Sequence, residues 1–182
     1  MARLIASRSR DANAKNGGGP PQLVVPGRRA KRPAMRIALY QPEIAGNVGA
    51  VLRLGACFGI AVDLIEPMGF EWDDKRVRRA AMDYIDHVEA ARHANFDAFR
   101  SVHKASRLVL LTTKGETALY DARFMPDDIL LFGQESAGVP DSIAAQCALT
   151  VRIPIRPEVR SLNLATSAAI ALGEALRQIG TQ

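Results

Sequence analysis

Short apolar runs alternate with segments of helical periodicity from Met35 onward, and this alternation most constrains the fold. The predicted strands cover residues 36–40, 61–65, 107–111, 128–132 and 150–153. The predicted helices cover residues 47–58, 73–81, 95–103, 139–147 and 164–179. Strands that are apolar throughout are covered on both faces, and strands separated by helices pair in parallel. The sequence therefore predicts an α/β fold with a mainly parallel sheet flanked by helices.

Two of the predicted helices carry an apolar stripe that should face the sheet. In the helix over 47–58 the stripe consists of Val48, Val51, Leu52 and Gly55. In the last helix we expect the inward positions to be Ala165, Ala168, Ala169, Leu172, Leu176 and Ile179. Residues at i, i+3 and i+4 share one face of a helix, so the small residues of the last stripe predict close packing.

Residues 1–34 differ in composition from the rest of the chain. They contain the run Gly17-Gly-Gly-Pro-Pro21 and few apolar residues, which is typical of a disordered arm. We therefore divide the chain into an N-terminal extension, 1–34, and one domain, 35–182. The extension is open to three interpretations: a basic tail that attracts RNA, a solvated extension without function, or sequence that precedes a true start at Met35.

The positive net charge of the chain comes from this extension. Residues 1–34 hold eight basic residues and one acid, whereas the remaining 148 residues hold 16 basic and 18 acidic residues. The domain is therefore slightly acidic, and the pI of the whole chain is no argument for nucleic-acid binding, which requires a local basic patch.

Several classes of protein are excluded or disfavoured. No run approaches the roughly 18 apolar residues of a membrane span, and the N-terminus has no apolar core of a secretory signal. Cys57 and Cys147 lie apart in apolar surroundings, so we expect two buried thiols in a reducing cytoplasm. The chain has no GxGxxG after its first strand, no P-loop and no GxSxG elbow.

The sequence also offers no metal-binding motif. His87, His93 and His103 are not arranged as paired ligands, and we expect all three at the surface. A metal site is accordingly not predicted.

Four polar, glycine-rich loops follow predicted strands: 41–47, 112–115, 133–138 and 154–163. Ligands of open α/β sheets bind beyond the carboxyl ends of the strands, so these loops form the candidate site. In the last loop Pro154 and Pro157 prevent regular structure, and Ser161 or Asn163 is suited to cap the helix that follows. The loop is either a ledge for a small polar ligand or an ordinary strand-to-helix connection.

Charged residues near these loops have two interpretations each. Gly49 and Arg53 share a helix face, and Glu43, Asn47 and Arg53 are expected at the same end of the sheet. Arg53 either reaches into the site or belongs to a solvated face. The residues Lys75, Arg76, Arg78 and Arg79 either contact phosphates or form a solvated helix face.

Three segments resemble the motifs of the SPOUT class of RNA methyltransferases, in the order and spacing of that family. They are Pro42-Glu-Ile-Ala-Gly-Asn-Val-Gly-Ala-Val-Leu-Arg53, Leu131-Phe-Gly-Gln-Glu-Ser-Ala-Gly-Val-Pro140 and the stretch from Arg152 to Leu164. The segment from Ile65 to Arg76, with Tyr84 and Thr112-Thr-Lys-Gly115, resembles one branch closely: the small tRNA 2′-O-methyltransferases of the wobble cytidine or uridine. The match spans about residues 35–180.

The resemblance implies a fold, a cofactor and an assembly. The C-terminal part should form a trefoil knot, a rare exception among protein folds, whose loops bind S-adenosylmethionine. Two subunits should pair through the first and last helices, and the dimer surface should receive the anticodon stem-loop of tRNA. The implied cofactor-binding residues are Leu111, Thr112, Gly133, Glu135, Gly138, Ile153 and Ser161.

The implied catalytic residues are Arg53 and Asn163, and the implied tRNA contacts are Glu43, Asn47, Lys75, Arg76, Arg78 and Arg79. Methyl transfer from a sulfonium to a ribose 2′-OH requires alignment and removal of a proton, but no metal. A guanidinium is a poor base, so we expect Arg53 to position the ribose or its phosphate.

The expected function is therefore cytoplasmic 2′-O-methylation of nucleotide 34 of tRNA. Two alternatives remain: a SPOUT ribose methyltransferase that acts on rRNA or another tRNA position, and a catalytically silent RNA-binding relative.

Overall fold

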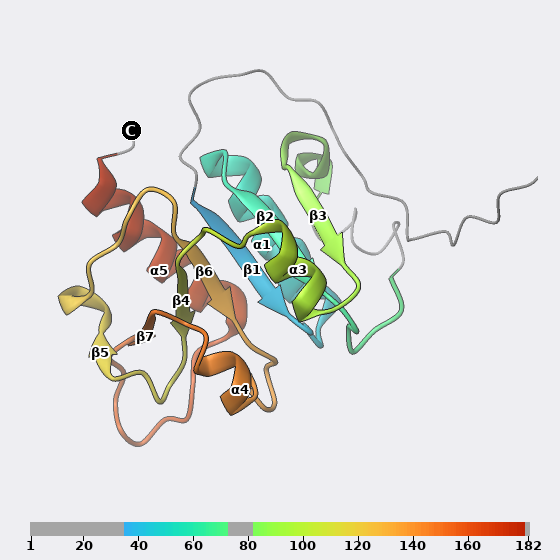
Figure 1. Cartoon of the computed structure of the whole chain (residues 1–182). Helices are drawn as coiled ribbons and strands as arrows, with labels where there is room; N and C mark the ends of the chain where they lie inside the picture. Colours follow the sequence, from blue (N-terminus) through green and yellow to red (C-terminus); the bar gives the residue numbers. More distant parts are fainter. Residues whose placement is uncertain (1–34, 73–81, 181–182) are drawn as a thin grey trace, which may run out of the picture.

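The computed structural model describes residues 35–72 and 82–180, and within them it contains one seven-stranded sheet (Figure 1). The strand order is β3-β2-β1-β6-β4-β7-β5, and every strand pairs in parallel with its neighbours. The strands are β1 (Arg36–Tyr40), β2 (Ala61–Ile65), β3 (Ala90–His93), β4 (Leu108–Leu111), β5 (Thr117–Ala118), β6 (Ile129–Phe132) and β7 (Leu149–Arg152). The α/β class and the parallel sheet are confirmed.

Helices cover both faces of this sheet. They are α1 (Ala45–Phe58), α3 (Phe96–Val102), α4 (Asp141–Ala144) and α5 (Leu164–Ile179), with short 3₁₀ helices η1 (Met82–His87) and η2 (Leu119–Asp121). Helices α1 and α5 pack on one face and form the larger hydrophobic core. Helices α3 and α4 pack on the other face around Phe96, Phe99 and Ile143. The continuous apolar strands are buried because both faces are covered.

The sequence prediction agrees with most of these elements. The stripe of α1 is confirmed, since Val48, Val51, Leu52 and Gly55 are buried. The predicted helix over 73–81 lies outside the described residues. Strand β3 was not predicted, because its sequence Ala-Ala-Arg-His has too little β-branched or aromatic character to indicate a strand.

Two packing predictions are corrected. The buried positions of α5 are Leu164, Ala168, Ala171, Leu172, Ala175 and Leu176, whereas Ala169 is exposed. Alanines occur on several faces of α5, so their spacing alone could not fix which stripe points inward. Cys57 is also exposed, since it lies near the end of α1 on the side away from the core, while Cys147 is partly buried.

The segment between β4 and β6 crosses two later parts of the chain. Its residues Gly115 and Glu116 accept hydrogen bonds from Nη1 of Arg152, at 2.8 and 2.6 Å. Further along, Gln178 of α5 donates to the carbonyl of Ala122 at 3.0 Å and accepts from the N–H of Phe124 at 3.1 Å. This crossing segment is therefore fixed to both β7 and α5.

None of the described helices is long and apolar enough to cross a membrane.

Candidate active site

The candidate loops meet at the carboxyl edge of β1, β6, β4 and β7. Because these four strands are parallel and adjacent, the residues that follow them emerge side by side. Leu111 ends β4 in register with Phe132 of β6 and Val151 of β7. The N–H of Thr112 then donates to the carbonyl of Val151 at 2.9 Å. Leu111, Gly133 and Ile153 consequently end or follow three neighbouring strands, as the sequence predicted.

The loop 133–138 is a narrow turn that depends on two glycines. Gln134 and Gly138 exchange two backbone hydrogen bonds, each of 2.9 Å. A Cβ on Gly133 would lie 2.3 Å from the carbonyl carbon of Gly138, so no side chain fits there. Gly138 itself has a φ of +71°, a conformation that glycine adopts without strain. The turn therefore presents Glu135 and Ser136 in a fixed geometry.

Glu135 connects the three motif segments. Its carboxylate accepts hydrogen bonds from the N–H of Glu43 and from Nδ2 of Asn47, both at 2.9 Å. Asn47 is 8% exposed, and its Oδ1 accepts from Nδ2 of Asn163 at 2.8 Å. Asn163, Asn47 and Glu135 thus form a continuous relay of hydrogen bonds between segments about 90 and 116 residues apart.

Asn163 is held from a second side as well. Its Oδ1 accepts from the N–H groups of Ala165 and Thr166, at 2.9 and 3.3 Å, and so caps α5. The cap was expected at Ser161 or Asn163, and the structure assigns it to Asn163. With both ends of its amide engaged, Asn163 has a single defined orientation.

Glu43 makes a second contact between the same two loops. Its carboxylate accepts from the N–H of Ser136 at 2.8 Å and from Ser136 Oγ at 2.7 Å. These hydrogen bonds hold the pKa of Glu43 below its usual range. Ser136 was not among the predicted site residues, although it lies inside the Gly133–Gly138 motif. The carboxylate of Glu43 was assigned to substrate, and here it fastens the two loops together.

Arg53 lies elsewhere on α1. Six residues separate it from Asn47, which corresponds to about 9 Å along the axis and about 120° around it. Its side chain is exposed, and its Cζ lies 4.9 Å from the ring centroid of Tyr84 in η1, a cation–π contact. The sequence indicated Tyr84 only through the family resemblance, and the structure places it against the predicted catalytic arginine.

The remaining predicted residues differ in how closely the structure ties them to the site. Ile153 is half-buried and packs against the larger core, whereas Ser161 is exposed. Lys75, Arg76, Arg78 and Arg79 lie outside the described residues.

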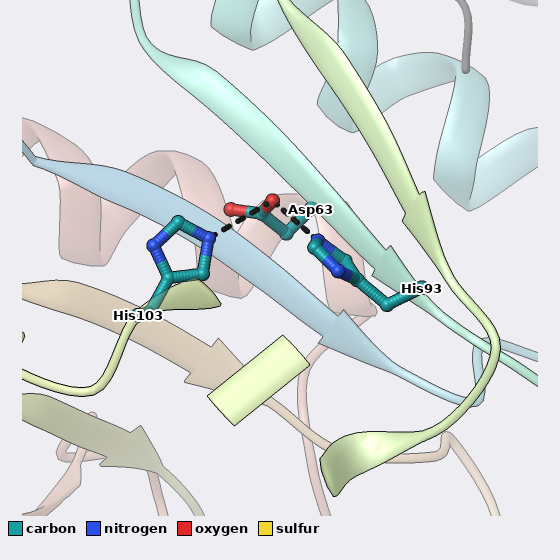
Figure 2. A group of neighbouring side chains, drawn as sticks. All are labelled: Asp63, His93 and His103. Atoms are coloured by element: carbon teal, nitrogen blue, oxygen red, sulfur yellow. Dashed lines mark hydrogen bonds and ion pairs between the residues drawn. The ribbon is translucent and has the colours of Figure 1, made fainter. Parts of the chain in front are cut away.

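The expectation for the histidines was wrong for two of the three. His87 is exposed, but His93 is 8% exposed, and the side chain of His103 is 12% exposed. Both rings lie against the fully buried carboxylate of Asp63 in β2 (Figure 2). Recognising β3 would have indicated this burial, because His93 is the last residue of that strand.

Comparison with known proteins identifies the family. A family model described as the SpoU rRNA Methylase family matches residues 34–173. The chain belongs to this family. The resemblance stated from the sequence motifs is thereby confirmed.

Relatives within the SpoU family resemble the chain over most of their length. A tRNA (cytidine(34)-2′-O)-methyltransferase of Beijerinckia indica is 53% identical over 146 residues, which are 79% of this chain and 91% of the relative. The protein of the same name from Escherichia coli K12 is 43% identical over 148 residues, covering 80% of this chain and 94% of the relative.

Solved structures of SpoU-type proteins share the fold. One, described as "Structural insights into the 2-OH methylation of C/U34 on tRNA", has a TM-score of 0.76 at 41% identity and covers 79% of this chain and 95% of its own. An AdoMet-bound rRNA methyltransferase from Sinorhizobium meliloti has a TM-score of 0.71 at 28% identity and covers 79% of this chain and 56% of its own.

Proposed function

We propose that this chain is the methyltransferase that transfers a methyl group from S-adenosylmethionine to the ribose 2′-OH of nucleotide 34, a cytidine or uridine, in tRNA. The observation that carries the proposal is the 53% identity to a relative of that name, 91% of which the match covers. The structure supports it because the three family motifs meet at one edge of the sheet, joined by Asn47, Glu135 and Asn163.

The residues at this edge fit the cofactor. Leu111 and Ile153 provide apolar walls for an adenine, and the tight turn from Gly133 to Gly138 places backbone groups beside them. Thr112, Glu135 and Ser161 supply polar groups at the same edge. When bound, S-adenosylmethionine supplies an electrophilic methyl group on its sulfonium.

The protein's own contribution to the reaction is alignment. Asn163, held by Asn47 and by its helix cap, is the group we assign to the acceptor ribose. The guanidinium of Arg53 donates hydrogen bonds and is a poor base. Its role is therefore to hold the ribose or the adjacent phosphate and to stabilise the developing alkoxide. No metal takes part in these steps.

We also propose that the C-terminal segment is knotted. The segment between β4 and β6 is bonded on one side to Arg152 and on the other to Gln178, so the chain after β7 has to pass it before α5 packs on α1. Stretching the protein from its two ends in a force experiment tests this proposal. A knotted chain reaches a shorter final length than an unknotted chain of 182 residues. An unshortened length would refute the knot.

The active unit proposed is a homodimer formed through α1 and α5. Two large apolar side chains at the ends of α1 are exposed: Ile44 at 51% and Phe58 at 54%. On the outer face of α5, the exposed residues Ala169 and Gly173 are small, so a second helix can approach closely. Anticodon stem-loops would bind across the pair in the cytoplasm, with Lys75, Arg76, Arg78 and Arg79 as phosphate contacts. Light scattering during gel filtration should report twice the mass of 19.7 kDa. A monomer would contradict the assembly.

The decisive test of function is methyl transfer to unmodified tRNA. We expect wild type to methylate position 34, whereas Arg53→Ala should lose activity while binding S-adenosylmethionine with unchanged affinity in calorimetry. Mass spectrometry of tRNA from a deletion strain should show loss of the 2′-O-methyl group at position 34. Loss of a methyl group from rRNA or from another tRNA position would favour the first alternative. Absence of cofactor binding would favour the silent RNA-binding relative.

A further inference from the structure

Asp63, His93 and His103 form a buried cluster on the face of the sheet opposite α1 and α5 (Figure 2). Asp63 is fully buried in the middle of β2, His93 ends the neighbouring strand β3, and His103 follows α3. The Nε2 atoms of the two imidazoles lie 2.8 and 3.4 Å from the same oxygen, Oδ1 of Asp63. The cluster has no part in the proposed methyl transfer.

We propose that these three side chains bind one divalent transition-metal ion, Zn²⁺ or an ion with similar ligand preferences. Two imidazole nitrogens and one carboxylate oxygen are a ligand set that zinc accepts, with water completing a tetrahedral site. The ion joins β2, the edge strand β3 and the end of α3. Its role is structural, which is compatible with a methyl transfer that uses no metal.

The spacing of the ligand atoms matches such an ion. All three atoms lie within 4.8 Å of one another. Given the two distances to Oδ1, a point equidistant from the three atoms is at most about 2.5 Å from each of them. Bonds in zinc sites are about 2.0–2.2 Å long. Movements of a few tenths of an ångström, well within the reach of small ring rotations, would therefore complete the coordination.

Arg36 fixes the orientation of the Asp63 carboxylate. Arg36 donates from Nε to Oδ2 of Asp63 at 2.6 Å, leaving Oδ1 turned toward the histidines, although Nη2 also makes a longer contact of 3.2 Å with Oδ1. The same guanidinium pairs with Glu89 at 3.2 Å. Asp63 and Glu89 thus both accept from the guanidinium of Arg36. Arg36 then acts as the outer partner that orients the coordinating carboxylate.

The experiment titrates ZnCl₂ into the full chain after EDTA treatment and dialysis, and monitors calorimetry and thermal unfolding. Wild type should bind one Zn²⁺ per chain and unfold at a higher temperature with the metal, because an ion that binds only the folded state stabilises it. Mg²⁺, which prefers oxygen ligands, should do neither.

Matched variants localise the binding. His93→Gln and His103→Gln should each lower the Zn²⁺ affinity by at least about 100-fold, since even outer partners of a metal site contribute 10- to 100-fold. His87→Gln removes the one exposed histidine and Cys57→Ser the exposed thiol, and both should bind as wild type does. If His93→Gln fails to fold, His103→Gln, whose ring is partly exposed, carries the test. Absence of saturable binding by wild type, or unchanged affinity in a folded His93→Gln or His103→Gln variant, would overturn the proposal.

Discussion

Replacing Asn47 by aspartate tests the relay at the centre of the candidate site. Nδ2 of Asn47 donates to Glu135 at 2.9 Å, and the exchange puts a carboxylate in its place with almost no change of shape. Two unit charges 2.9 Å apart repel by about 6 kcal/mol at an effective dielectric constant of 20. Taking up one proton relieves this repulsion. At pH 7 that proton costs about 4 kcal/mol, since an ordinary carboxyl has a pKa near 4 and each pH unit is worth about 1.4 kcal/mol.

Because taking up a proton costs less free energy than the repulsion between the two charges, protonation of the pair determines the expected result. Asn47→Asp should therefore lower the free energy of unfolding by about 4 kcal/mol at pH 7 and by about 1.4 kcal/mol at pH 5. The sign follows from linkage: the pair binds a proton in the folded state that the unfolded state releases above pH 4. The penalty is consequently present at neutral pH and disappears as the pH falls toward 4.

Urea denaturation at both pH values, at one fixed protein concentration, provides the measurement. Asn47→Ala is the matched control, because it removes the same hydrogen bonds without adding charge. It should cost about 1–3 kcal/mol, nearly equally at pH 5 and pH 7. If the penalty of Asn47→Asp differed between the two pH values by no more than that of Asn47→Ala, the contact between Asn47 and Glu135 would be refuted.

Four further perturbations follow from other parts of the structure. Gly133→Ala, whose Cβ would lie 2.3 Å from the backbone of Gly138, should strain the turn by about 1–3 kcal/mol and weaken S-adenosylmethionine binding about 10- to 100-fold in calorimetry. Gln178→Ala should lower the free energy of unfolding by about 1–3 kcal/mol in urea, because it removes both bonds to the crossing segment. Burial raises the pKa of Cys147 to about 11, so at pH 8 a thiol reagent should modify one cysteine fast, and Cys57→Ser should abolish that fast phase. Removal of residues 1–34 should leave methyl transfer and thermal stability unchanged, whereas a loss of either would assign the extension a role.

The sequence by itself determined the fold class and the edge of the sheet at which the site lies. Apolar strands separated by helices bury both of their faces when they form a parallel sheet covered by helices on both sides. In such a sheet, the loops that follow the strands lie together at one edge. That reasoning places the loops at 41–47 and 133–138 beside one another, and the contacts of Glu43 and Asn47 with Glu135 confirm it. The motifs also identified the family.

Only the tertiary structure decided which groups touch within that site. Local periodicity cannot tell that Glu43 binds Ser136, or that Arg53 lies against Tyr84, because these contacts join segments that are remote in the chain. The histidines show the same limit. His93 and His103 occur in a polar stretch typical of a surface, yet the pairing of β3 with β2 carries them to a buried carboxylate. Burial depends on what the rest of the chain places over a residue, and a sequence pattern records only its neighbours along the chain.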